Sequence, residues 1–148
     1  MQIISPDTLA RIGEKITLIG LATKAVGAEV AGGNAVALRS ARESLAASEA
    51  DYDKAIGELA PEQREWVETL FADALAKARA GRDGYHTDVY MAQIKWADDQ
   101  VRELETITAE LKDARTEWVQ DAMSYDVTAY QVAKLCGRTP STVQRWVK

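Results

Sequence analysis

Residues 127–148 hold the side chains with the clearest chemical potential in the chain. This segment contains four cations, Lys134, Arg138, Arg145 and Lys148, and no acid, so its formal charge is +4. The whole chain has 18 basic and 23 acidic residues, so the other 126 residues carry 14 basic and 23 acidic ones, a net charge of -9. Cations attract phosphate groups, whereas acids repel them. The asymmetry predicts a small basic contact module on an acidic body that faces away from phosphates.

The residue spacing within this segment predicts two short helices joined by a tight turn. Thr128 and Gln131 form a T-x-x-Q capping box that starts the first helix. Gly137 breaks that helix because glycine tolerates a positive φ. Thr139 caps the second helix, and Pro140 occupies its first position.

The core of this module is predicted from the apolar residues of the two helices. We expect the first helix to bury Val132 and Leu135, with Cys136 as a further candidate. Val143 and Trp146 should point inward from the second helix. Ala133 is small, as the close crossing of the second helix requires.

The segment resembles the helix-turn-helix superfamily in the trihelical form shared by many bacterial and phage regulators, resolvases and transposases. The resemblance rests on the spacing of Ala133, Gly137 and Val143 and on the ending Thr-Pro-Ser-Thr-Val-Gln-Arg-Trp. If the preceding long helix supplies the first of the three helices, its Trp118, Val119 and Ala122 would pack on Val132, Leu135 and Trp146. Arg138 departs from the pattern, because this position is often apolar; it either loosens the core or adds a phosphate contact.

The resemblance implies that the second helix of the motif lies in the major groove of double-stranded DNA. Gln144 would then pair bidentately with adenine and Arg145 with guanine. Thr139 with nearby backbone N–H groups, Lys134 and Arg138 would hold phosphates. The predicted DNA-binding residues are Lys134, Arg138, Thr139, Ser141, Thr142, Gln144, Arg145 and Lys148.

The rest of the chain predicts an all-α fold, because it is rich in helix-forming residues and its three prolines sit at helix starts. We expect a helical bundle or elongated helical arm over residues 1–105 and the helix-turn-helix module over residues 106–148. We expect the first helix to begin after Ser5 and to end near Gly27 or at Gly32-Gly33, and the second to follow Asn34. The third is expected from Pro61 to Gly81 and the fourth from about Thr87 to Met123.

The last of these helices carries an apolar seam that Thr108 and Arg115 interrupt. The seam consists of Tyr90, Ile94, Ala97, Val101, Leu104, Leu111 and Trp118. A packed bundle helix and a short dimeric coiled coil both give such a seam. We expect a homodimer, because one small module binds DNA weakly alone; the competing interpretation is that the first three helices cover the seam. Trp96 lies off the seam and marks a contact with the third helix or with a partner.

Catalysis has little support in the sequence, and we expect no enzyme, cofactor or metal site. His86 is the single histidine and forms only a lone D-x-x-H with Asp83. Cys136 has no recognisable nucleophile set around it. The chain shows no signal peptide, no membrane span and no possible internal disulfide, which fits a cytoplasmic protein.

These observations favour a sequence-specific DNA-binding protein, most simply a transcriptional regulator of bacterial or phage type. Its acidic helical region would dimerise or bind a protein partner. One alternative is a structural or interaction protein whose terminal motif docks protein. Another is a DNA recombination or packaging accessory factor.

Overall fold

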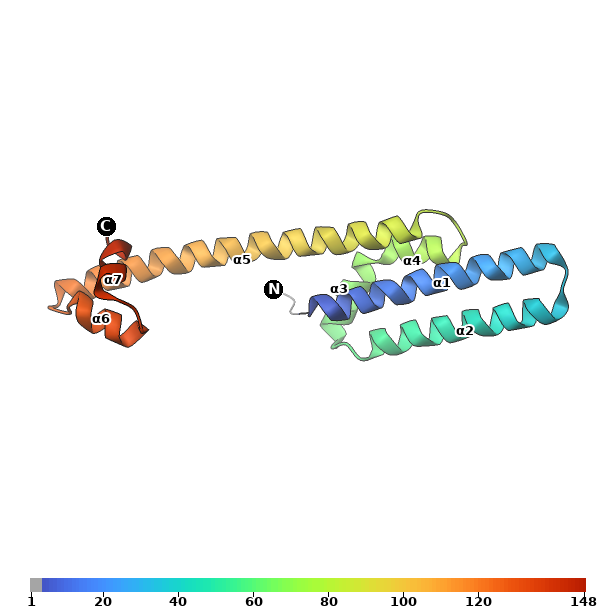
Figure 1. The fold of residues 1–148 in the computed structure, drawn as a ribbon, viewed down its shortest axis with the longest axis horizontal. Helices are drawn as coiled ribbons and strands as arrows, with labels where there is room; N and C mark the ends of the chain where they lie inside the picture. The colour runs from blue at the N-terminus through green and yellow to red at the C-terminus, as the bar shows by residue number, and fades with distance from the viewer. Residues whose placement is uncertain (1–3) are drawn as a thin grey trace. The chain divides into compact units, whose positions relative to one another are not determined.

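The computed structural model describes residues 4–148, which form seven α-helices and no strand (Figure 1). The predicted all-α fold is confirmed. The chain divides into two compact units, Met1–Asp99 and Gln100–Lys148. The division falls within one long helix, a few residues before the expected boundary at residue 105. The helices are α1 (Pro6–Gly32), α2 (Ala35–Gly57), α3 (Pro61–Leu70), α4 (Ala72–Arg79), α5 (Tyr85–Ser124), α6 (Ala129–Cys136) and α7 (Pro140–Trp146).

Local capping residues define the ends of α1 and the start of α2. The Ser5 hydroxyl accepts a hydrogen bond from the Thr8 N–H at 3.1 Å, and Pro6 follows at the first helical position. Helix α1 continues past Gly27 and ends where Gly33 adopts a φ of 71°. Asn34 then caps α2, which returns alongside α1 (Figure 1).

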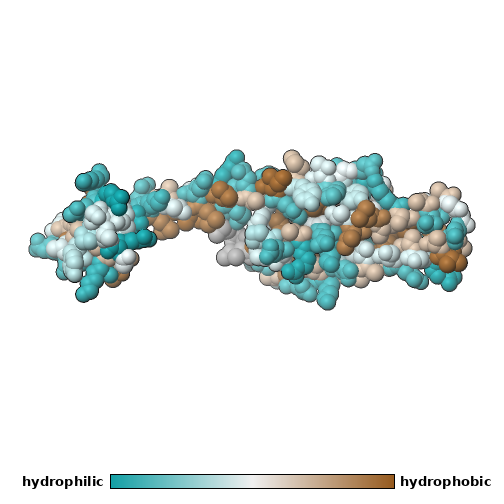
Figure 2. Space-filling model, viewed as in Figure 1, coloured by the Kyte–Doolittle hydropathy of each residue, from teal (hydrophilic) through white to brown (hydrophobic). Residues whose placement is uncertain are grey.

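The apolar seam of α5 lies at the surface of the chain. Its large members from Tyr90 to Trp118 are between 48% and 67% exposed. Figure 2 shows apolar side chains, in brown, at the surface along this helix. Within the N-terminal unit, the first three helices therefore do not cover the seam residues Tyr90 and Ile94. Among residues 4–148, no helix combines the length and the apolar composition needed to cross a membrane.

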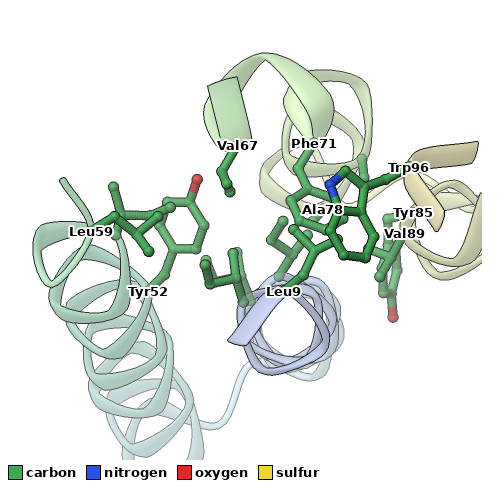
Figure 3. Packing of buried hydrophobic residues seen from close by; sticks show 14 of the residues in the cluster. Leu9, Tyr52, Leu59, Val67, Phe71, Ala78, Tyr85, Val89 and Trp96 are labelled. Carbon is green, nitrogen blue, oxygen red and sulfur yellow. The ribbon is translucent and has the colours of Figure 1, made fainter. Parts of the chain in front are cut away.

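The N-terminal unit has its own hydrophobic core, to which α1 to α5 all contribute (Figure 3). Helix α5 enters this core through Tyr85, Val89 and Trp96 rather than through the seam. The rings of Trp96 and Trp66 lie 6.3 Å apart at their centroids, so Trp96 marks a contact with α3. Of the two alternatives that the sequence left open for Trp96, the structure shows the contact with the third helix.

The single helix expected from Pro61 to Gly81 is in fact two helices. The break is at Phe71, whose φ of -99° and ψ of 7° are not helical. Phe71 is 1% exposed and sits in the core. Val67, Phe71, Ala74 and Ala78 are all buried at steps of three or four residues, so the apolar pattern continues through the break and does not reveal it.

Candidate nucleic-acid interface

The C-terminal module begins with the helix ends that its sequence predicts. The Thr128 N–H donates to Gln131 Oε1 at 2.8 Å, and the Gln131 N–H donates to Thr128 Oγ1 at 3.2 Å. Gly137 has a φ of 62° and ends α6 in the left-handed conformation. Thr139 Oγ1 accepts from the Thr142 N–H at 3.3 Å and caps α7. The capping box, the turn glycine and the second cap are confirmed.

A small core holds α6 and α7 against the end of α5. Val119 of α5 is buried together with Val132 and Ala133 of α6 and Val143 of α7. Partly buried Met123, Val127, Ala129, Trp146 and Val147 surround them. The end of α5 thus supplies the first of the three helices of the module, as one version of the prediction had it. We call this three-helix module the head, comprising the end of α5 from residue 115, α6 and α7.

Three core predictions for the head are wrong. Leu135 is 86% exposed, Trp118 is 67% exposed, and Cys136 is exposed as well. The inward face of α6 passes through Val132 and Ala133, and at 100° per residue Leu135 lies about 110° around the helix from the middle of that face. Trp118 is likewise turned away because its neighbour Val119 takes the inward position.

Polar side chains of α5 hold the end of α7, a contact that the sequence did not reveal. The Arg115 guanidinium lies over the Trp146 ring, 3.8 Å from its centroid. Thr116 Oγ1 donates to the Trp146 carbonyl at 2.9 Å, and Gln120 Nε2 donates to the Val147 carbonyl at 3.4 Å. The sequence signals this contact only in that Arg115 interrupts the apolar seam.

The predicted DNA-binding residues lie on α6, in the turn and along α7. All are exposed except Thr142, which is half-buried. A chain of hydroxyl contacts links several of them. Thr139 Oγ1 lies 2.9 Å from Thr142 Oγ1 and 3.1 Å from Ser141 Oγ, and Arg145 donates to Thr142 Oγ1 at 3.2 Å. These hydroxyl contacts hold the Arg145 side chain on the outer surface of α7.

The cations of α6, the turn and α7 form no ion pair in the described chain, and the acids of the head, Glu117, Asp121 and Asp126, all lie before α6. Within residues 4–148, no ion pair involves Lys134, Arg138, Arg145 or Lys148. Exposed cations next to hydroxyl and amide groups are suited to contact phosphate oxygens and to hydrogen-bond base edges. This is the chemistry that the arrangement offers.

The remaining surface of the described chain offers little other chemistry. Residues 4–148 contain no group of three or more His, Cys, Asp or Glu residues placed to hold a metal ion. His86 stacks on Tyr90 with ring centroids 5.1 Å apart. Lys24 pairs with Asp83, and this hydrogen bond raises the pKa of the lysine and lowers that of the carboxyl group. We assign these groups no functional role.

Comparison of the chain with models of protein families, with curated proteins and with solved structures found no match in any of the three. The geometry and charge of the head are therefore the features from which a function can be inferred.

Proposed function

We propose that this protein binds double-stranded DNA through its head, with α7 in the major groove. The observation that carries the proposal is the two-sided character of α7. Val143 is fully buried and Trp146 half-buried on one side, while Gln144 and Arg145 are exposed on the other. A recognition helix needs this division, because one face must be held rigidly while the other reads bases.

The charge of the head supports the same proposal. Lys134 on α6, Arg138 in the turn and Lys148 after α7 are exposed and carry no described ion pair. We assign them to phosphate contacts, which position a protein on the duplex without reading its sequence. Arg145 and Gln144 then supply direct readout of guanine and adenine in the proposed complex.

The biological role that we propose is transcriptional regulation. Recombination or packaging would use the same head, so the location of the bound site decides between these roles. Binding at a promoter supports regulation, whereas binding at a recombination or packaging site supports an accessory role.

One observation favours protein docking as a second candidate function. Tyr130 and Leu135 of α6 are 67% and 86% exposed, which leaves apolar surface on the head itself. Large exposed apolar side chains can mark protein contacts. This candidate requires α6 rather than α7 to make the decisive contacts.

A pair of substitutions in α7 tests DNA binding. Arg145→Ala should cost about 1–3 kcal/mol of affinity on a specific duplex and leave the helical content unchanged, because the side chain is exposed. Trp146→Ala should cost up to about 3–5 kcal/mol of stability and abolish binding by loosening the head. Arg82→Ala removes the same charge from an exposed position outside the head and serves as the matched control.

Circular dichroism and duplex affinity separate these outcomes. If Arg145→Ala binds every tested duplex as well as the parent chain, α7 does not read bases. Docking of a protein partner through α6 would then become the better interpretation, and Leu135→Ser should weaken binding of that partner.

A further inference from the structure

The exposed seam of α5 within the C-terminal unit is an apolar surface that the proposed DNA contact does not use. Val101, Leu104, Ile107, Leu111 and Trp118 are between 37% and 67% exposed. They recur at steps of three, four or seven residues and so form one stripe along the helix. The stripe borders a shallow groove lined by Val101, Leu104, Glu105, Thr108, Ala109 and Lys112.

We propose that this stripe pairs with the same stripe of a second copy of the chain, in antiparallel orientation. A two-fold interface uses one patch twice, so that patch must be complementary to itself. The surface from Val101 to Trp118 meets this condition in its apolar spacing and in its charges. All of these residues lie within the unit Gln100–Lys148.

The orientation follows from two opposite charges at the edge of the stripe. Glu105 and Lys112 both border the groove and lie seven residues apart, two turns along the same edge. In an antiparallel pair, Glu105 of each copy faces Lys112 of the other, so two interchain ion pairs form by symmetry. Charges that flank an apolar seam set the orientation of paired helices in this way.

A parallel, in-register pair would fit the same surface less well. In a two-fold parallel pair, the two Glu105 side chains lie on opposite flanks of the interface, as do the two Lys112 side chains, so neither residue meets a charge of opposite sign. Arg115 would face its own counterpart across the seam, although its guanidinium is already engaged over Trp146. The antiparallel pair is favoured because it lets Glu105 and Lys112 form interchain ion pairs.

The antiparallel pair also sets the distance between two heads. Pairing Glu105 with Lys112 places the two-fold axis opposite the midpoint of these residues, between Thr108 and Ala109. Val119, in the core of the head, lies about 10.5 residues beyond that point. At about 1.5 Å per residue, the two copies of Val119 are about 32 Å apart along the helix axis.

This separation is close to the length of one turn of B-DNA, about 34 Å. Provided that the head binds DNA as proposed above, the dimer should therefore recognise half-sites centred about one turn apart rather than two. The helix pair itself does not depend on DNA binding.

Exchange of the two charges tests the helix pair on the full-length chain without DNA. Glu105→Lys and Lys112→Glu should each weaken dimerisation roughly tenfold, because two attractive pairs become repulsive. The double variant that carries both substitutions should restore the parent dissociation constant. Both side chains are exposed or border an open groove, so circular dichroism should show no loss of helix.

Sedimentation equilibrium gives the dissociation constants. A parent chain that is monomeric at tens of micromolar, or a double variant no tighter than the single ones, would overturn the proposal. In a Cys136→Ser background, Val101→Cys should form no disulfide-linked dimer, because Val101 lies away from the two-fold axis. Efficient crosslinking there would show a parallel pair and overturn the antiparallel one.

The failure of this proposal is distinguishable from the failure of DNA binding. A dimer with the expected charge rescue that binds no duplex would leave the helix pair standing and reject the proposed function. A monomer that binds duplex DNA would do the reverse.

Discussion

Tyr52 shows how a single buried side chain can introduce a pH dependence into the N-terminal unit. It is 4% exposed, and its hydroxyl has no hydrogen-bond partner among residues 4–148. Burial raises the pKa of this hydroxyl and nearby Glu68 raises it further, while Arg79, 5.8 Å from the ring centroid, opposes the shift. Figure 3 shows Tyr52 among the core residues of α2.

We expect the free energy of unfolding to fall in alkaline solution because of Tyr52. Its folded-state pKa lies above the unfolded value of about 10, so its contribution is complete below that pH and is lost as the pH rises toward the folded value. Tyr52→Phe should remove this loss and change stability at neutral pH by no more than about 1 kcal/mol, because the lost hydroxyl is unpaired. Urea unfolding at about pH 7 and pH 11 measures both effects.

The exposed Tyr90 provides the control for this experiment, because Tyr90→Phe should leave the alkaline loss unchanged. An alkaline loss of the same size in Tyr52→Phe and in the parent chain would show that another group causes it.

Gly13 and Gly20 show a second residue-scale constraint, on the packing of α1 against α5. A Cβ added at Gly13 would lie 2.8 Å from Val89 Cγ1, and one at Gly20 would lie 2.6 Å from Tyr85 Cζ. Both distances are below ordinary van der Waals contact. The two glycines are two turns apart on α1, and each makes room for a buried side chain of α5.

Gly20→Ala should therefore destabilise the chain although alanine is the better helix former. Overpacking costs about 1–3 kcal/mol, and the gain in helix propensity offsets about 1 kcal/mol of it. Gly27→Ala is the matched control, because nothing lies within 4 Å of its added Cβ. It should raise stability by about 1 kcal/mol. Thermal unfolding of both variants measures the difference, and equal effects would refute the packing argument.

At the scale of elements, the sequence predicted what depends on local chemistry. Thr128, Gln131, Gly137 and Thr139 define their helix ends through their own side chains or backbone freedom, so they were identifiable in isolation. The same holds for Asn34. These local rules account for both ends of α6 and for the start of α7.

The predictions that were wrong concern features that depend on contacts between elements. At the break, Phe71 lies in the core, and the apolar periodicity continues through it. Leu135 is an apolar residue of the kind found in cores, but it is exposed on α6, because Val132 and Ala133 occupy the inward positions of this small head. The polarity of the candidate DNA-binding residues was enough to predict that they are exposed. The contact of Arg115 with Trp146 could not be predicted without the fold.

The Arg115 and Thr116 contacts predict how α7 is attached to α5. Arg115→Ala should cost about 0.5–2 kcal/mol through the lost contact with the Trp146 ring. Thr116→Val should cost about 0.5–1.5 kcal/mol through the lost hydrogen bond to the Trp146 carbonyl. Hydrogen exchange should speed up in α7 in both variants and remain unchanged in α1 and α2. Unchanged exchange in α7 would show that these contacts do not stabilise the head.

At the scale of the whole molecule, opposite charges are separated along the chain. The head contributes the four unpaired cations of residues 127–148, and the remainder of the chain is strongly acidic. Only a bound state in which the acidic region stays away from the phosphates gains from this separation. In the proposed dimer, two heads would double the attraction without changing the contacts that each head makes.

This doubling predicts a specific salt dependence of DNA binding. Three phosphate-contacting cations per chain give a slope of log K against log salt of about -2.7, and two heads give about -5.4. Lys112→Glu, which should break the helix pair without touching the head, should return the slope toward about -2.7. Lys134→Ala should reduce the parent slope by about 0.9 per chain, whereas Arg82→Ala, outside the head, should not change it. Titrations from about 50 to 200 mM salt measure these slopes. Affinity that is flat across this range would reject phosphate contact by the head, and a slope near about -2.7 for the parent chain would reject two heads bound together.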